Sequence, residues 1–227
     1  MRVLFVEAKA NLDVIPALEK NLKTLQKYKK FALATTVQFV EQLPTAQIFL
    51  EQNKIKVFVG KPSLHAIKPG QLLGCDPTAA LSVAKEVNAI LYIGTGEFHP
   101  GPVEVGTDKT VLKLNPFTKK ITEVTGEEIR RHKLKNLARI EKFKAAKTIG
   151  ILVTTKLGQS EMQGPAQKIK EKLEKQGKQV FLFLGDTFNY KDLENFPNIE
   201  AWVNTACPRV TDDQELIGRP VVNVNEL

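Results

Sequence analysis

Short apolar runs alternate with helix-patterned segments along most of this chain. The apolar runs have the length of strands, and polar or turn-forming residues follow each of them. The clearest runs are residues 31–36, 56–59, 89–93, 148–153, 179–184 and 201–204. Strands that alternate with helices predict an α/β fold with mainly parallel sheets flanked by helices. In such sheets, ligands bind beyond the carboxyl ends of the strands.

Several local signals refine this prediction. Residues 2–6 are predicted as a strand, and residues 11–25 as a helix with Asn11 as its N-cap. Pro44 is expected to break or kink the next helix. Residues 111–124 are predicted to form a hairpin around an Asn-Pro-Phe turn.

A long, highly charged segment divides the sequence. We interpret residues 126–147 as a connecting helix between two modules. The module before it, residues 1–125, contains Cys75, and the module after it, residues 148–227, contains Cys207.

The two modules share a short pattern. In each, a predicted strand ends in a pair of threonines, and a glutamine and a helix follow; the pairs are Thr35-Thr36 and Thr154-Thr155. The pattern predicts a duplication that gives two related α/β modules with a cleft between them. Each module would bring one cysteine to that cleft.

Charge and cysteine usage limit the classes of function. The formal net charge of the 227 residues is +8, and such a charge favours acidic partners, of which nucleic acid is the default. A lysine-rich, solvated surface is the simpler explanation of the same charge. No apolar run approaches the roughly 18 residues of a membrane span, and residues 2–6 do not resemble a signal peptide. Two cysteines do not make a disulfide framework, so we expect a reducing cytoplasm.

Cys75 and Cys207 are the only cysteines, and each follows an apolar run and stands among turn-forming residues. Such a setting predicts a thiol on a loop. A zinc site needs four ligands, and neither cysteine has a second one nearby; the histidines, at 65, 99 and 132, are scattered. A three-cysteine 4Fe–4S site needs one thiol more than this chain has. Composition alone favours two unrelated cysteines.

A series of motifs carries a specific resemblance over almost the whole length. They are Thr35-Thr36-Val37-Gln38-Phe39, Leu73-Gly74-Cys75, Tyr92 to His99, Asn115-Pro116-Phe117, Thr155 to Gln159 and Ala206-Cys207-Pro208-Arg209. In this order, the sequence resembles the diphthamide synthase family, the 2-(3-amino-3-carboxypropyl)histidine synthase subunits.

The resemblance implies a cofactor and a reaction. Members of the family have three related α/β domains, and each domain supplies one cysteine to a 4Fe–4S cluster. Cys75 corresponds to the second ligand and Cys207 to the third. The open iron binds S-adenosylmethionine, and a 3-amino-3-carboxypropyl group passes through a carbon radical to a histidine of translation elongation factor 2. The reductant is not identified by the sequence.

The chain departs from the family pattern because the first domain and its cysteine are absent from this sequence. A second polypeptide or another copy of this chain would then complete the site. The absence also fits a truncated chain, or a reduced homologue that lacks the radical reaction. A non-catalytic scaffold or assembly subunit and a basic RNA-binding module stand as alternative functions.

The resemblance also suggests contacts to S-adenosylmethionine, from Gln38, Gly94, Gly96, Phe98, His99, Gly158, Gln159 and Arg209. Each of these residue types has an ordinary structural alternative. Glutamines tie loops together, glycines make tight turns, a turn phenylalanine belongs to a core, and an arginine simply follows the Cys-Pro turn. Asp76 is interpreted as a cap of the helix that begins near Thr78. No catalytic residue is assigned.

Overall fold

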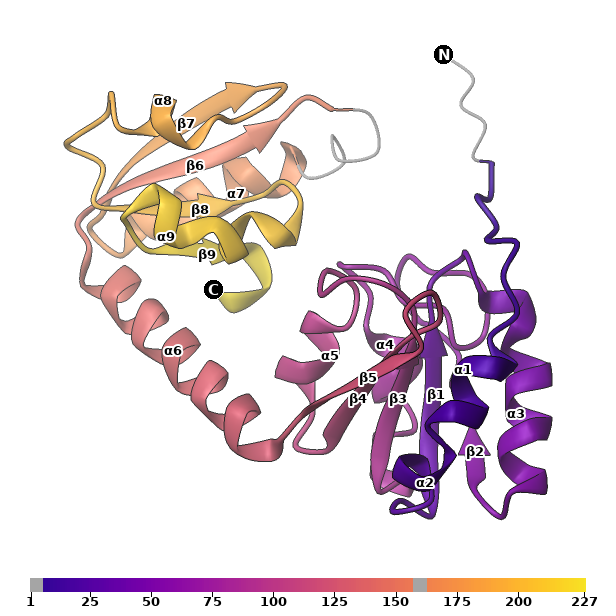
Figure 1. The fold of residues 1–227 in the computed structure, drawn as a ribbon. Helices are drawn as coiled ribbons and strands as arrows, with labels where there is room; N and C mark the ends of the chain where they lie inside the picture. The colour runs from indigo at the N-terminus through magenta and orange to yellow at the C-terminus, as the bar shows by residue number, and fades with distance from the viewer. Residues whose placement is uncertain (1–5, 157–162) are drawn as a thin grey trace. The chain divides into compact units, whose positions relative to one another are not determined.

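The computed structural model describes residues 6–156 and 163–227. The chain divides into two units, Met1–His132 and Lys133–Leu227, each with its own sheet (Figure 1). The division falls within helix α6 (Gly126–Ala145), inside the segment predicted as the connector. Among the helices of the described residues, none has the length and apolarity to cross a membrane.

The first unit contains a five-stranded sheet with the order β2-β1-β3-β4-β5. The first four strands in that order are parallel and β5 is antiparallel to β4, as the hairpin prediction requires. The strands are β1 (Lys30–Thr35), β2 (Lys56–Phe58), β3 (Ala89–Ile93), β4 (Thr110–Asn115) and β5 (Lys120–Val124). The helices are α1 (Ile15–Lys20), α2 (Leu22–Leu25), η1 (Val40–Gln42), α3 (Leu43–Gln52), α4 (Thr78–Leu81), η2 (Ala84–Glu86) and α5 (Gly101–Gly106).

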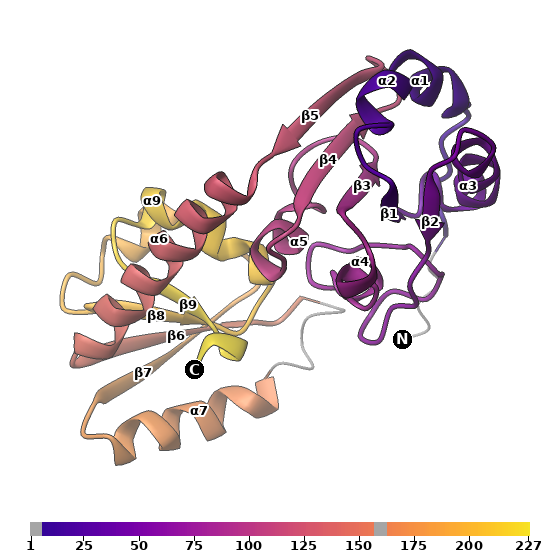
Figure 2. The same ribbon diagram turned by 90° about the horizontal axis from the view of Figure 1, so that it is seen from below.

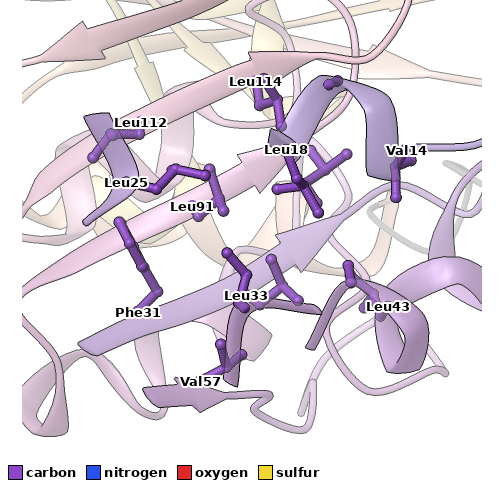
Figure 3. Close-up of a cluster of buried hydrophobic side chains, with 14 of the residues drawn as sticks. Val14, Leu18, Leu25, Phe31, Leu33, Leu43, Val57, Leu91, Leu112 and Leu114 are labelled. Carbon is purple, nitrogen blue, oxygen red and sulfur yellow. The ribbon is translucent and has the colours of Figure 1, made fainter. Parts of the chain in front are cut away.

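Both faces of the inner strands β1 and β3 are buried, which explains their continuous apolar runs. Phe31 and Leu33 of β1 point into a core that α1, α2 and α3 cover, and Figure 3 shows this cluster. Ala32 and Ala34 point the opposite way, toward α4 and α5. The alternation follows from the two-residue period of a strand.

The second unit contains a fully parallel sheet with the order β7-β6-β8-β9. Its elements are β6 (Thr148–Thr154), α7 (Gln163–Lys175), β7 (Gln179–Gly185), α8 (Tyr190–Leu193), β8 (Ala201–Asn204), η4 (Pro208–Asp213), α9 (Gln214–Ile217), β9 (Val221–Asn223) and η5 (Val224–Glu226). One face packs against α7 and the end of α6, both labelled in Figure 2. The other face packs against α8 and α9.

Three local predictions are wrong in their details. Residues 11–25 form two short helices, and Val14 rather than Asn11 is the N-cap of α1. Pro44 does not break a helix but stands in the first turn of α3, where its missing N–H costs nothing. The helix expected to begin near Thr78 is two short pieces, α4 and η2. Of the predicted strand at 2–6, only Val6 is described, and it is not in a strand.

The two sheets share a connectivity. In each, the strand that comes second in the chain pairs with the first, the first pairs with the third, and the third pairs with the fourth. This common order agrees with two related α/β modules, and β5 is an addition to the first of them.

Candidate functional site

Cys75 lies on a tight turn at the carboxyl end of β1. The turn is closed by two backbone hydrogen bonds, from Leu73 N to Asp76 O (3.1 Å) and from Asp76 N to Leu73 O (3.0 Å). Leu72 N donates to the carbonyl of Thr35, the last residue of β1, at 2.7 Å. These bonds hold the half-buried Cys75 next to the sheet edge where α/β proteins bind ligands.

The buried carboxylate of Asp76 locks the loop around this turn. One oxygen accepts the backbone N–H groups of His65 and Ala66, both at 2.8 Å, and the other accepts the N–H and hydroxyl of Thr78. Burial raises the pKa of the Asp76 carboxyl, but the four hydrogen bonds outweigh burial and hold that pKa below its ordinary value. Pro77 rather than Asp76 is the N-cap of α4, but Asp76 binds the N–H of Thr78, the first residue of that helix, and also fixes the loop before Cys75.

Gln71 fixes the same loop from its other side. Its side-chain oxygen accepts the backbone N–H groups of Ile67 (3.3 Å) and Lys68 (3.0 Å). The segment 65–68 is therefore bound to Gln71 and Asp76, two polar side chains that lie largely or wholly inside the protein. Nothing in the sequence singles out Gln71, because a glutamine among prolines and glycines carries no pattern.

The Gly-rich turn after β3 reaches the Cys75 turn through Phe98. A Cβ atom added to Gly74 would lie 2.4 Å from the Phe98 ring, so only glycine admits this close approach. The Phe98 ring also meets the His99 ring edge-on, with 5.1 Å between centroids. Phe98 is 46% exposed, which excludes the core role considered for it.

The glycines of this turn have different functions. Gly94 N donates to the carbonyl of Leu114 at 3.0 Å, and a Cβ on Gly94 would collide with the Tyr92 hydroxyl. Gly96 has a φ of +70°, and a Cβ there would have no described atom within 4 Å. Gly94 is thus required by packing, whereas Gly96 is required by the turn and leaves open space beside it.

A half-buried lysine ties the Gly-rich turn to the sheet. Lys113 of β4 forms ion pairs with Glu97 of the turn and, at 3.1 Å, with Glu104 of α5. Burial lowers the pKa of the Lys113 ammonium, but hydrogen bonds to the two carboxylates outweigh burial and raise its pKa above the ordinary value. Lys113 therefore stays charged and holds the turn and α5 together.

The end of β1 carries two further polar groups. The Thr36 hydroxyl is buried and has no hydrogen-bond partner among the described residues. Gln38, two residues later, is exposed, and its backbone carbonyl accepts Ala10 N at 3.0 Å. A buried hydroxyl without a partner is costly, so Thr36 is a candidate to contact a ligand.

Cys207 lies on the turn that follows β8. Thr205 donates from both its N–H (3.1 Å) and its hydroxyl (2.8 Å) to the carbonyl of Leu152 in β6. Asn204 donates from its side chain to the carbonyl of Cys207 at 2.8 Å. The side chains of Asn204 and Thr205 therefore fix the backbone that carries the half-buried Cys207.

The two cysteines stand at different places in the shared connectivity. Cys75 follows β2, the second strand of its unit, and Cys207 follows β8, the third strand of its unit. The place of Cys207 corresponds in the first unit to the Gly-rich turn after β3. The modules are alike, but their cysteine turns are not equivalent.

Three of the predicted S-adenosylmethionine contacts fall outside the part of the chain that the structure describes. Gly158 and Gln159 lie outside the described residues, and the side chain of Arg209 does too. Thr155, just before them, donates its N–H to Gly185 O at 3.1 Å. Within residues 6–156 and 163–227, no group of three histidine, cysteine or acidic side chains is placed to hold a metal ion.

Comparison with known proteins decides the family. A family model described as "Putative diphthamide synthesis protein" matches residues 1–227. This chain belongs to the diphthamide synthesis family. It is 37% identical over 227 residues to the 2-(3-amino-3-carboxypropyl)histidine synthase of Pyrococcus horikoshii, and 29% identical over 217 residues to human subunit 1 of the synthase of that name.

A solved structure in the diphthamide synthesis family has the same fold. The crystal structure of Dph2 from Pyrococcus horikoshii with a 4Fe–4S cluster superposes with a TM-score of 0.80 at 35% identity. The match covers 96% of this chain and 62% of that one. The chain likewise spans 64% of the Pyrococcus synthase and 47% of the human subunit, less than two thirds of either relative.

Proposed function

We propose that this chain supplies two ligands, Cys75 and Cys207, to a 4Fe–4S cluster. The observation that carries the proposal is the similarity, over 96% of this chain, to a Dph2 structure that contains such a cluster. Both thiols are half-buried on turns beyond the carboxyl ends of strands, the usual place for ligands in this class of sheet.

The donor set fits a cluster better than it fits an ordinary metal ion. Thiolates are the usual ligands of iron–sulfur clusters, and both cysteines lie on turns that hydrogen bonds hold in place. Each unit contributes one thiol, so the remaining ligand would come from a second chain or from a second copy of this one. The cluster, when bound, would supply the electron that the reaction needs.

We assign the chain to diphthamide biosynthesis, as part of a 3-amino-3-carboxypropyl transferase that uses S-adenosylmethionine. The substrate of this reaction would be a histidine of translation elongation factor 2, in the cytoplasm. The names of the relatives, 2-(3-amino-3-carboxypropyl)histidine synthase, support the transferred group and a histidine as its acceptor.

Residues of the first unit would orient S-adenosylmethionine. Thr36 offers a buried hydroxyl without a partner among the described residues, and the exposed Gln38 lies two residues after it. Gly96 leaves open space, and the Phe98 ring covers Gly74 next to Cys75. These groups would bind and orient the substrate, while the half-exposed ring shields the Cys75 turn from water.

Anaerobic reconstitution with iron and sulfide tests the ligand assignment. The wild-type chain, supplied with an external thiol for the third position, should become brown with broad visible absorption. Cys75→Ala and Cys207→Ala should each lose that absorption. His65→Ala is the matched control, because the His65 side chain is exposed and only its backbone N–H holds the loop. Unchanged absorption in either cysteine variant would remove that ligand, and a colourless wild type would favour a scaffold subunit.

A further inference from the structure

Two asparagine side chains hold the backbone on both sides of the Cys207 thiol. Asn204 accepts Ala206 N with its oxygen at 3.0 Å and donates to Cys207 O at 2.8 Å. Asn223, at the end of β9, donates to Pro208 O at 3.0 Å. Three successive residues, with the cysteine in the middle, are therefore fixed by side chains from two strand ends.

The two asparagines also bind each other. Asn204 donates to the side-chain oxygen of Asn223 at 2.7 Å. Asn204 is 2% exposed, and this bond uses the second of its two amide hydrogens, so every polar group of its side chain is paired. A buried polar network with all groups satisfied has one preferred arrangement, and so it specifies the conformation of the turn.

Glu226 and Arg139 hold Asn223 in turn. Glu226 accepts the Asn223 N–H at 2.7 Å with one carboxylate oxygen, and its other oxygen pairs with the Arg139 guanidinium. The same guanidinium donates to the carbonyl of Val221 at 2.6 Å. Arg139 therefore binds both the first residue of β9 and Glu226, which holds the last residue of that strand.

The chemistry of this contact needs an arginine. Arg139 is 6% exposed, and its two terminal nitrogens bind two different acceptors, Val221 and Glu226. A planar fork suits two separated acceptors, whereas a lysine offers one compact charge on a flexible stem. Substitution with lysine preserves the charge but not the geometry.

We propose that Arg139 is a positioning residue for Cys207. Through Glu226, Asn223 and Asn204, it fixes the backbone that carries the thiol. The inference rests on the proposed function, because it matters to the reaction only if Cys207 is a cluster ligand. Arg139 lies on α6, far from Cys207 in sequence, and no motif points to it.

The test compares the two cysteines within one sample. In the apo full-length chain, the rates at which iodoacetamide alkylates Cys207 and Cys75 are measured by mass spectrometry. We expect Arg139→Lys to change the Cys207 to Cys75 ratio at least fivefold, because Cys75 lies in the other unit and serves as the internal reference. Glu226→Gln, a milder change at a partly exposed side chain, should shift the ratio in the same direction. The double variant should add little, because both changes break one chain of contacts.

A control separates positioning from general loss of stability. Leu173→Ala makes a cavity in the core of the same unit and removes none of the hydrogen bonds of Arg139 or the asparagines, so it should lower the melting temperature and leave the alkylation ratio unchanged. In the reconstituted protein, Arg139→Lys should release iron to a chelator at least fivefold faster than Leu173→Ala does.

The outcomes distinguish the two proposals. A wild-type chain that binds no cluster under any condition would overturn the proposed function. A chain that binds a cluster, but whose alkylation ratio and iron release are the same in Arg139→Lys and Leu173→Ala, would overturn this inference alone.

Discussion

Asp76→Asn tests whether one carboxylate organises the Cys75 turn. An asparagine has a single side-chain oxygen, so it can satisfy either the N–H groups of His65 and Ala66 or the two donors of Thr78, but not both pairs. Its amide nitrogen would then face the donors of the other pair. The substitution preserves the shape of the side chain and removes half of its acceptor capacity.

The expected cost can be estimated from the bonds that are lost. Hydrogen bonds to a charged group contribute about 1.5–3 kcal/mol each. Losing two of the four should lower the free energy of local opening by roughly 3 kcal/mol, after allowing for water that reaches the loop. The loop should then open about a hundredfold more often. Hydrogen exchange at the amides of Leu73 and Asp76, which close the turn, should accelerate by that factor.

The assay has an internal reference and a matched control. Trp202, the only tryptophan, is buried in the second unit. The urea midpoint that its fluorescence reports should therefore be the same in the variant and in the wild type. Asp13→Asn is the control, because exposed Asp13 accepts one backbone N–H, from Ile15, which an asparagine oxygen can still accept. If Asp76→Asn exchanged no faster than Asp13→Asn at the turn amides, the carboxylate would not organise the turn.

The pH dependence of this effect has a defined sign. The folded pKa of Asp76 lies below its ordinary value of 3.8, so the carboxylate stabilises the fold fully above that value. The stabilisation is lost as the pH falls through the lower, folded pKa. The difference in stability between wild type and Asp76→Asn should therefore be constant near neutral pH and shrink in acid below about pH 4.

Three further substitutions have expected outcomes. Gly150→Ala would place a Cβ 2.3 Å from the Trp202 ring, so the free energy of unfolding of the second unit should fall by about 1–3 kcal/mol and the tryptophan emission should shift. An unchanged urea midpoint would contradict this packing. Gly74→Ala should displace the half-exposed Phe98 ring at little cost in stability and change the alkylation rate of the adjacent Cys75. In a double-mutant cycle, adding Phe98→Ala should remove this change in the alkylation rate. Thr36→Val removes a buried hydroxyl without a described partner, so the melting temperature should stay equal or rise. Titration should show S-adenosylmethionine binding weakened by roughly tenfold. A lower melting temperature would mean that the hydroxyl has a partner within the fold.

The sequence predicts the elements whose pattern is local. The apolar runs predict strands β1, β3 and β6 to within a residue, because a parallel strand buried on both faces is apolar throughout. The turn residues predict the hairpin of β4 and β5, and in the structure the Asn115 side chain accepts two backbone N–H groups of that turn. The prediction for Pro44 is wrong because a proline in the first turn of a helix and one inside it look alike in sequence.

The candidate site is predictable only in its cysteines. The position of Asp76 next to Cys75 is visible in the sequence, but its bonds to the 65–66 backbone depend on a loop that returns to it. Asn204 and Asn223 are isolated asparagines in sequence, and only the pairing of β8 with β9 brings them together. Long-range polar networks leave no periodic trace, because each member is fixed by a partner from a distant segment.

The different placement of the two cysteines has a consequence for engineering. Because both sheets follow one strand order, yet one thiol comes after the second strand and the other after the third, the sheet itself does not dictate where a cysteine stands. The loops decide, each with its own side-chain clamp. A thiol grafted into the glycine turn after β3 would therefore need an amide counterpart of Asn204 transplanted with it, because exchange of the cysteine alone would leave out the hydrogen bond that Asn204 donates to the Cys207 carbonyl.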